Sequence, residues 1–162
     1  VLFSTSATAP TMPANYTMKR RIGAVRTDSS GNLIAFLQYG DLFLWKSPPF
    51  LDVDDATLTT AKKDYTLSGV PGGLVVEALA NVLIYHASAN SYVYVSNPNL
   101  TDLAPSITAT PLLTIRAAST VPIPQKIGII TNTSAQISAR SSTTSTTIRA
   151  SVLGWNDPRG KW

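Results

Sequence analysis

The 162-residue sequence predicts an all-β fold, an antiparallel β-sandwich of the jelly-roll type with an extended N-terminal arm. Serine and threonine together supply 37 residues, and the 11 prolines and 9 glycines recur between short apolar runs. Glutamate occurs once and methionine twice, so helix formers are scarce while strand and turn formers are abundant. The runs indicate roughly nine or ten strands about 8–12 residues apart, a spacing typical of a sandwich or barrel.

Residues 1–15 are expected to form an extended arm or linker outside the core, ahead of a single β-sandwich domain over residues 16–162. Their Ser, Thr, Ala and Pro content cannot bury enough apolar surface to offset the cost of ordering. Val1, Leu2 and Phe3 are the exception, and they are the candidate residues for attaching the arm to a neighbouring protein.

The first strands are expected to form a hairpin. Strand-like runs at Arg21–Thr27 and Leu33–Gln38 flank residues 28–32, where Asp, Ser, Gly and Asn favour a turn. A tight corner then leads into a strand at Leu42–Lys46. That strand ends at residues 47–49, because proline cannot donate a backbone hydrogen bond to a ladder.

The next part of the chain is expected to alternate between loops and strands. Residues 50–63 are predicted to form a long polar connection, with at most a short strand at Thr57–Thr60. A strand at Asp64–Leu67 follows, and the Gly- and Pro-rich stretch at 68–73 ends it. Leu74–His86 is too rich in β-branched residues for a helix, so we assign it to one strand or to two with a kink.

The remaining strands follow the same alternation. They are predicted at Tyr92–Ser96, Leu112–Ala117, Gln125–Thr131, Ala135–Ser142 and Thr146–Gly154. The stretch Ser138–Thr147 is rich in serine and threonine, but Ile137 and Ile148 keep the rhythm of a strand. We interpret this stretch as an edge or solvent-facing hairpin.

The charge balance argues against a nucleic-acid partner. The net charge is +4, yet the basic residues are scattered apart from the run Lys19-Arg20-Arg21. A nucleic-acid-binding surface needs a basic stripe, often interleaved with aromatic side chains that stack on bases. No apolar run approaches the ~20 residues of a membrane-spanning helix. We therefore expect neither a nucleic acid nor a membrane span.

The residue inventory also argues against an enzyme. The chain has no cysteine, which excludes disulfides, thiolate zinc sites and cysteine nucleophiles. The single histidine, His86, ends an apolar run, and we interpret it as a strand-end residue and not as a general base or metal ligand. The motifs G-x-S-x-G, G-x-G-x-x-G and the P-loop are absent. We expect no catalytic residue and no cofactor, and a hydrolase is the least favoured alternative.

The acidic group Asp52, Asp54 and Asp55 is the best candidate for a metal site, because Ca²⁺ takes several oxygen ligands from one loop. The spacing lacks the glycine and the closing glutamate of an EF-hand, so we interpret the group as a solvated loop without a metal. Glu77 lies in an apolar stretch, and a buried carboxylate needs a partner. We expect a structural pair with an arginine, for which a subunit interface is one location.

Tyr92 and Tyr94 are two residues apart, so a strand places both side chains on one face. Such a pair can stack on a sugar, as in a carbohydrate-binding module. Packing in the core or at an oligomer interface is the favoured interpretation, because tyrosine suits positions where one end of the side chain is apolar and the other is wet.

Two stretches of the chain resemble a known group of proteins. Residues 16–45 contain Y-T-x-K-R-R-I-G, S-G and F-x-Q-x-G-D-x-F-x-W, and residues 153–161 contain G-W-x-D-x-R-G. This pattern resembles small virion structural proteins of tailed bacteriophages and prophages. The resemblance implies a structural β-domain on a phage particle, and it does not distinguish tail, fibre and capsid or carry over any site residue.

The main hypothesis is a virion structural protein, an oligomeric fibre, spike or tail-associated domain that contacts other virion proteins and the host surface, including a glycan there. The alternatives are a capsid decoration protein and, from another class, a carbohydrate-binding module. We expect a homo-oligomer, because a sandwich with few charges leaves its open strand edges unguarded. A trimer is implied by the phage resemblance alone.

Overall fold

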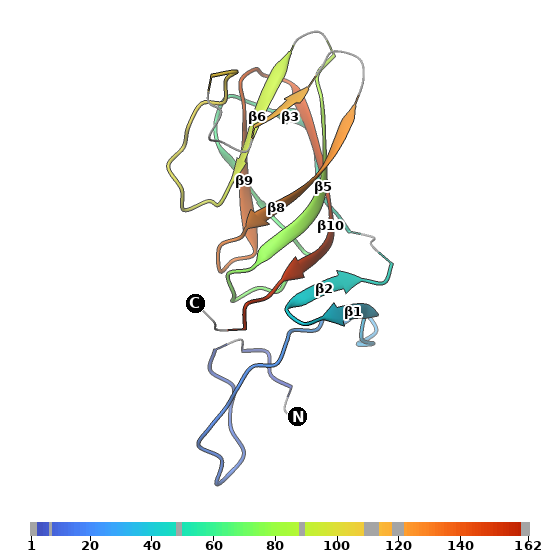
Figure 1. Cartoon of the computed structure of the whole chain (residues 1–162), viewed down its shortest axis with the longest axis vertical. Coiled ribbons are helices and arrows are strands. Elements are labelled where there is room, and N and C mark those ends of the chain that lie inside the picture. The colour runs from blue at the N-terminus through green and yellow to red at the C-terminus, as the bar shows by residue number, and fades with distance from the viewer. Residues whose placement is uncertain are drawn as a thin grey trace.

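The computed structural model describes residues 3–6, 8–47, 50–87, 90–108, 114–117 and 122–159. This part of the chain contains ten strands and no helix, which confirms the predicted all-β class. All strand pairs are antiparallel, and they form two sheets packed as a sandwich (Figure 1). Among the described residues, no helix is long and apolar enough to cross a membrane.

The two sheets differ in size. The six-stranded sheet contains β1 (Phe36–Tyr39), β2 (Leu42–Trp45), β3 (Phe50–Leu58), β5 (Glu77–Tyr85), β8 (Ile123–Ile130) and β10 (Thr146–Asn156). The four-stranded sheet contains β4 (Lys63–Thr66), β6 (Ser91–Ser96), β7 (Thr114–Ala117) and β9 (Gln136–Ser141). The strands from β4 to β10 lie where the sequence predicts them, with ends shifted by a few residues.

The longest strand, β10, holds the larger sheet together. It pairs with β5 along its length, with β3 over Thr146–Val152 and with β2 over Gly154–Asn156. Its alternate residues Ile148, Ala150 and Val152 are buried, because one face of a strand points toward the opposite sheet. A change in this strand therefore affects the pairing of three others.

The strand pairs β3·β10, β4·β9, β5·β8 and β6·β7 nest inside one another along the chain. The result is the order β3-β10-β5-β8 in one sheet and β4-β9-β6-β7 in the other. A long antiparallel ribbon folded over on itself has this pairing. The β1–β2 hairpin extends the larger sheet beyond these eight strands.

The core between the sheets is aliphatic in the middle and aromatic at one end. The rings of Phe43 and Trp155 stack there with centroids 5.0 Å apart and 3° between their planes. Trp45 lies 5.2 Å from Trp155, and Phe36 lies 5.8 Å from Phe43, again between centroids. An added Cβ at Gly154 would overlap the carbonyl of Phe43, so the approach of β2 to β10 requires glycine at this position.

The predicted hairpin between Arg21–Thr27 and Leu33–Gln38 is wrong, because only its turn forms. A single bridge joins Thr27 to Leu33, around a turn in which the carboxylate of Asp28 accepts two backbone N–H groups. The end of the second run forms β1 and pairs with β2 instead. This pairing gives β1 a complete ladder and lets its first residue pack against the aromatic end of the core.

The predicted polar connection at residues 50–63 is also wrong, because most of it is β3. Val53 and Leu58 are buried in the core. The stretch is predicted to be a solvated loop because it has three carboxylates within four residues, and burying carboxylates is costly. The folded chain offsets the cost of burying Asp55 with hydrogen bonds from Thr57, Lys63 and Tyr65.

The predicted edge or solvent-facing hairpin at Ser138–Thr147 is wrong as well. β9 lies between β4 and β6 in one sheet, and β10 is internal in the other. The hydroxyl of Ser91 lies 2.7 Å from that of Ser141 and 2.8 Å from that of Thr146, and Thr143 donates to Ser91. Because each hydroxyl both donates and accepts, this group is buried with its polar atoms satisfied.

The N-terminal part of the chain lies outside the sheets. The described residues 3–6 and 8–35 contain the one bridge but no strand, and none of those before residue 16 is buried. Figure 1 shows this blue segment extending past the end of the sandwich. The sheets therefore begin at β1, and the independence of the arm from the core stays a prediction.

Candidate functional site

Four charged side chains, Arg21, Asp41, Asp157 and Arg159, join the N-terminal part of the chain to the end of β10; we call them the clasp. Two guanidinium nitrogens of Arg21 donate to the two carboxylate oxygens of Asp157, which is fully buried. Arg159 donates from Nε to Oδ1 of Asp41 at 2.8 Å, and the Asp157 N–H donates to the Asp41 carbonyl at 2.8 Å. A bidentate charged pair fixes orientation as well as adding stability.

All four clasp residues belong to the motif-bearing stretches at residues 16–45 and 153–161. The opening stretch supplies Arg21 and Asp41, and the closing stretch supplies Asp157 and Arg159. The sequence predicted no site from these stretches. Each stretch contains both arginine and aspartate, which was a usable signal, but Arg21 and Asp157 are 136 residues apart, which hid their contact.

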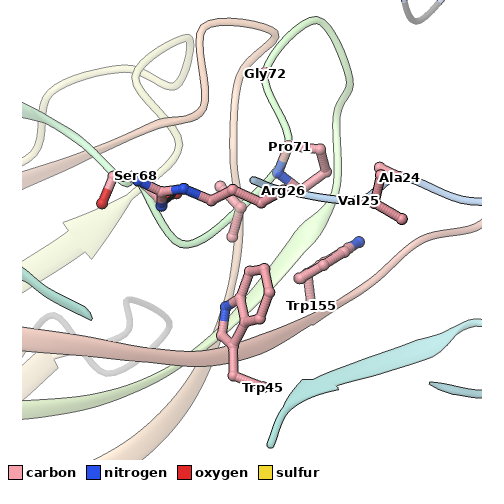
Figure 2. A pocket seen from close by; sticks show the side chains of 9 residues that line it. Ala24, Val25, Arg26, Trp45, Ser68, Pro71, Gly72 and Trp155 are labelled. Atoms are coloured by element: carbon pink, nitrogen blue, oxygen red, sulfur yellow. Dashed lines mark hydrogen bonds between the residues drawn. The ribbon is translucent and has the colours of Figure 1, made fainter. Parts of the chain in front are cut away.

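A pocket of about 240 Å³ lies where residues 24–26, which we call the strap, cross the aromatic end of the core (Figure 2). Its other walls are the rings of Trp45 and Trp155 and the loop between Ser68 and Gly72. The indole nitrogen of Trp45 donates to the Gly69 carbonyl at 2.9 Å. The indole nitrogen of Trp155 is buried and has no hydrogen-bond partner in the described structure.

Arg26 holds the strap over this pocket by hydrogen bonds. The Arg26 guanidinium donates to the Ser68 carbonyl, and Figure 2 shows the side chain running toward that loop. The Arg26 carbonyl accepts the backbone N–H of Ile34 at 2.9 Å. Sequence reasoning missed this pocket, because its walls come from four separate parts of the chain.

Exposed apolar side chains concentrate in residues 16–39, which we call the N-terminal apolar segment. They are Tyr16, Met18, Ile22, Val25, Leu33, Leu37 and Tyr39. Half of the large apolar side chains that are exposed in the described structure lie in this segment, and Met18 is 88% exposed. The strand β1 also lies here and, among the described strands, pairs with β2 alone, so the described structure leaves its other edge without a strand partner.

The predicted attachment residues precede this segment. Val1 and Leu2 lie outside the described residues, and Phe3 is exposed. Phe3 therefore adds one more uncovered ring to the N-terminal part of the chain.

The acidic residues of β3 bind different partners. Asp52 accepts the backbone N–H groups of Ser68 at 2.5 Å and of Gly69 at 3.2 Å, while Asp54 pairs with Arg149 at 2.8 Å. These side chains do not converge, and the described residues contain no group of three His, Asp or Glu that could hold a metal ion.

Asp55 is the buried member of that acidic group. Its carboxylate accepts the Lys63 ammonium at 2.6 Å, the Tyr65 hydroxyl at 2.7 Å and the Thr57 N–H at 2.7 Å. Burial alone raises the pKa of Asp55, but the hydrogen bonds from Lys63, Tyr65 and Thr57 outweigh it and hold this pKa well below its ordinary value. Burial, and then the bond to Asp55, raises the pKa of Tyr65. The expectation of a solvated, screened group is therefore wrong for Asp55.

The other two titratable candidates have hydrogen-bond partners within the chain. His86 is buried, with Nε2 3.1 Å from the Thr144 carbonyl. Glu77 accepts the side-chain amide of Asn156 at 2.7 Å, across the pairing of β5 with β10. The partner of this glutamate is thus an asparagine of the same chain, where an arginine was expected.

Tyr92 and Tyr94 alternate with the buried core residues of β6, so both lie on the outer face of the smaller sheet. Tyr92 is half-buried, but Tyr94 is only 7% exposed. Its neighbour in the ladder, Arg140, pairs with Asp102 at 2.7 Å and so ties the β6–β7 connection to this sheet. The two rings do not form an open stacking platform.

No protein-family model matches this chain, and no curated protein matches it either. The assignment of a function therefore depends on the surfaces and contacts described above.

Proposed function

We propose that the chain is a structural protein of a tailed-phage particle, which self-associates through its N-terminal apolar segment. The observation that carries this proposal is the concentration of exposed apolar side chains in residues 16–39, beside the open edge of β1. Large exposed apolar patches on a folded protein mark interaction sites.

The clasp makes this segment suitable for binding. Arg21 lies within the segment, and its pairing with the buried Asp157 attaches the segment to the end of the sandwich. A surface that is already held in place loses less conformational entropy when a partner covers it. The clasp therefore favours assembly by lowering this entropy loss, and it does not need to contact the partner itself.

The open edge of β1 indicates how copies meet. An exposed strand edge accepts a further strand through backbone hydrogen bonds, and side chains on the same surface supply specificity. Leu37 and Tyr39 are exposed on alternate positions of β1, so a partner that pairs there also covers apolar side chains. We propose a closed homo-oligomer, with the trimer taken from the phage resemblance.

Two observations support placing the domain on a virion. The nested strand pairing supports assignment of the eight strands β3–β10 to a jelly roll, an architecture common in capsid and lectin domains. The stretches that resemble virion proteins meet at the clasp, which gives their shared residues a role in folding. Partners would then be other virion proteins, with a fibre, spike or tail-associated position favoured over capsid decoration.

The carbohydrate-binding alternative loses its main support, because the buried ring of Tyr94 cannot stack on a sugar without movement of its surroundings. A host-surface glycan remains part of the fibre hypothesis only, and a glycan array tests it directly.

Sedimentation velocity of the full chain tests self-association. We expect an oligomer at micromolar concentration, and we expect Met18→Asp combined with Tyr39→Asp to yield monomers with an unchanged melting temperature. The matched control is Leu100→Asp combined with Ile107→Asp, which alters two exposed apolar side chains outside the segment. A wild-type chain that sediments only as a monomer would contradict the proposal.

The position on a virion needs a separate experiment. Mass spectrometry of purified tailed-phage particles from the source host should detect this chain, and immunogold labelling should place it on a fibre or tail. Labelling over the capsid would favour the decoration alternative, and absence from every particle would reject the virion assignment.

A further inference from the structure

We propose that the pocket beside Trp155 binds the proline-containing stretch Pro10-Thr11-Met12-Pro13 from the arm of a second copy of this chain. The proposal deepens the proposed function, because it rests on self-association and names the segment exchanged. It assigns a ligand of defined chemistry, an extended proline-rich peptide, to a site that sequence reasoning did not find.

The pocket contains one donor without an acceptor. Trp155 is 1% exposed and its indole N–H has no partner in the described structure, whereas the Trp45 N–H donates to Gly69. A buried polar group without a hydrogen bond is costly, so most have a partner. Trp155 is one of the pocket's lining residues (Figure 2), so an acceptor brought by a ligand could remove this cost.

Two backbone carbonyls at or beside the pocket already have donors. Those of Ser68 and Gly69 accept hydrogen bonds from Arg26 and Trp45. An N–H group of a ligand therefore could not use these two carbonyls. Proline has a carbonyl but no backbone N–H, so it can accept from the Trp155 donor without needing an acceptor from the pocket.

The size of the pocket and the chemistry of its walls also favour a proline-rich peptide. The volume of about 240 Å³ is below the roughly 300–1,000 Å³ of small-molecule pockets, which suits one or two residues of a peptide. Two indole rings, Val70 and Pro71 supply apolar walls. Proline-rich peptides dock in aromatic-lined grooves in this manner, because their extended helix is preformed and loses little entropy on binding.

The arm of this chain carries such a peptide. Pro10 and Pro13 are three residues apart, which is one turn of a polyproline helix and places both rings on one side. No residue of the described stretch 8–15 is buried or forms a strand. The stretch is thus available to a partner, and it brings no charge that would have to be buried.

Two observations favour a second copy over the chain's own arm. Val25 both lines the pocket and belongs to the N-terminal apolar segment, so the pocket is continuous with the proposed interface. Figure 1 shows the arm projecting beyond the end of the sandwich and not folded back onto it. The Trp155 nitrogen is covered, so docking requires residues 24 and 25 of the strap to move, while the hydrogen bond from Arg26 to Ser68 stays in place.

Nuclear magnetic resonance of the indole N–H groups tests the pocket directly. The probe is a synthetic peptide of residues 5–16, added to ¹⁵N-labelled full chain carrying Pro10→Ala and Pro13→Ala so that its own arm does not compete. We expect the peptide to shift the Trp155 indole signal, and the same peptide with both prolines replaced by alanine to shift it less than one-tenth as much. Trp155→Phe assigns the signal; if that variant does not fold, Trp45→Phe and Trp162→Phe assign it by elimination.

Mixing two full-length variants distinguishes exchange between copies from self-docking. The labelled chain keeps its pocket but carries the alanine arm, and the unlabelled chain keeps its arm but carries Trp155→Phe. A shift of the Trp155 signal on mixing supports exchange between copies. If the wild-type signal stays at the peptide-bound position on dilution to monomer, the chain's own arm fills the pocket and the proposal is wrong.

The two proposals fail separately. An unmoved Trp155 signal at millimolar peptide, or an equal shift with the alanine peptide, overturns the inference even if the wild-type chain sediments as an oligomer. A chain that sediments as a monomer while its Trp155 signal responds only to the proline peptide would instead reject the proposed assembly and leave the pocket as a peptide site.

Discussion

The sandwich and the N-terminal apolar segment contain the same apolar residue types, but the sandwich buries them and the segment exposes them. Ile148 in β10 is fully buried, whereas Ile22 in the segment is 58% exposed. In the sandwich, alternation along paired strands turns each apolar side chain toward the opposite sheet. The segment before β1, residues 16–35, forms only one bridge, so most of its apolar side chains have no opposite sheet to face.

This difference separates stability from assembly. The sandwich derives its stability from burial of apolar surface across two sheets. The segment is attached at a few points, chiefly the clasp and the aromatic end of the core, and it presents apolar surface to solvent. We expect changes in the sandwich to alter unfolding, and changes in the segment to alter association.

The largest effect should come from shortening an isoleucine in the sandwich. Ile148→Ala leaves a cavity at a fully buried position and should lower the free energy of unfolding by about 2–5 kcal/mol. The matched control Ile22→Ala should change it by less than about 0.5 kcal/mol. Urea denaturation measures both, and equal losses would erase the distinction between the two regions.

Breaking the clasp should have the next largest effect. Asp157→Asn removes the charge opposite Arg21 at a fully buried position and should cost about 2–3 kcal/mol. The control Asp54→Asn breaks the half-exposed pair with Arg149 and should cost less than about 1 kcal/mol.

Limited proteolysis sharpens the same comparison. The clasp variant should be cut faster within residues 16–35 than the control, because the segment loses its attachment to Asp157 while the sandwich stays folded. Unchanged cleavage would show that the segment is held by contacts other than the clasp.

A smaller, pH-dependent effect is expected at Asp55. Its pKa is lowered in the folded chain, so its stabilisation is complete well above the ordinary value of 3.8 and is lost as the pH falls below that value. Asp55→Asn should therefore cost about 1–3 kcal/mol at pH 7 and progressively less below pH 4. Unfolding curves of both chains between pH 7 and pH 3 measure this, and a pH-independent difference would contradict it.

The smallest effect on stability should come from removing residues 1–15. None of the described residues in this stretch is buried, so the melting temperature should change by less than about 2 °C, the shift expected for well under 1 kcal/mol. The same deletion should weaken self-association measured by sedimentation. A loss of many degrees would show that the arm packs on the sandwich.

The sequence by itself determined the fold class and the later strands. Alternation of apolar and polar residues, with glycine and proline between the runs, is a local property, so β4 to β10 could be placed from it. The composition of residues 1–15 likewise marked them as a candidate arm. These features depend on near neighbours in the chain, which the sequence displays directly.

The burial of polar side chains, the clasp and the pocket could not be predicted from the sequence, because each depends on contacts made in the folded chain. Lys63 and Tyr65 make Asp55 tolerable in a strand, and Ser91 lets the hydroxyl of Ser141 be buried, so both misread stretches became paired strands that contribute to the core. The pairing of Arg21 with Asp157 and the pocket at Trp155 likewise join residues far apart in the chain. A polar group can be buried at little cost only when it has a hydrogen-bond or ion-pair partner. The three-dimensional fold places that partner beside it.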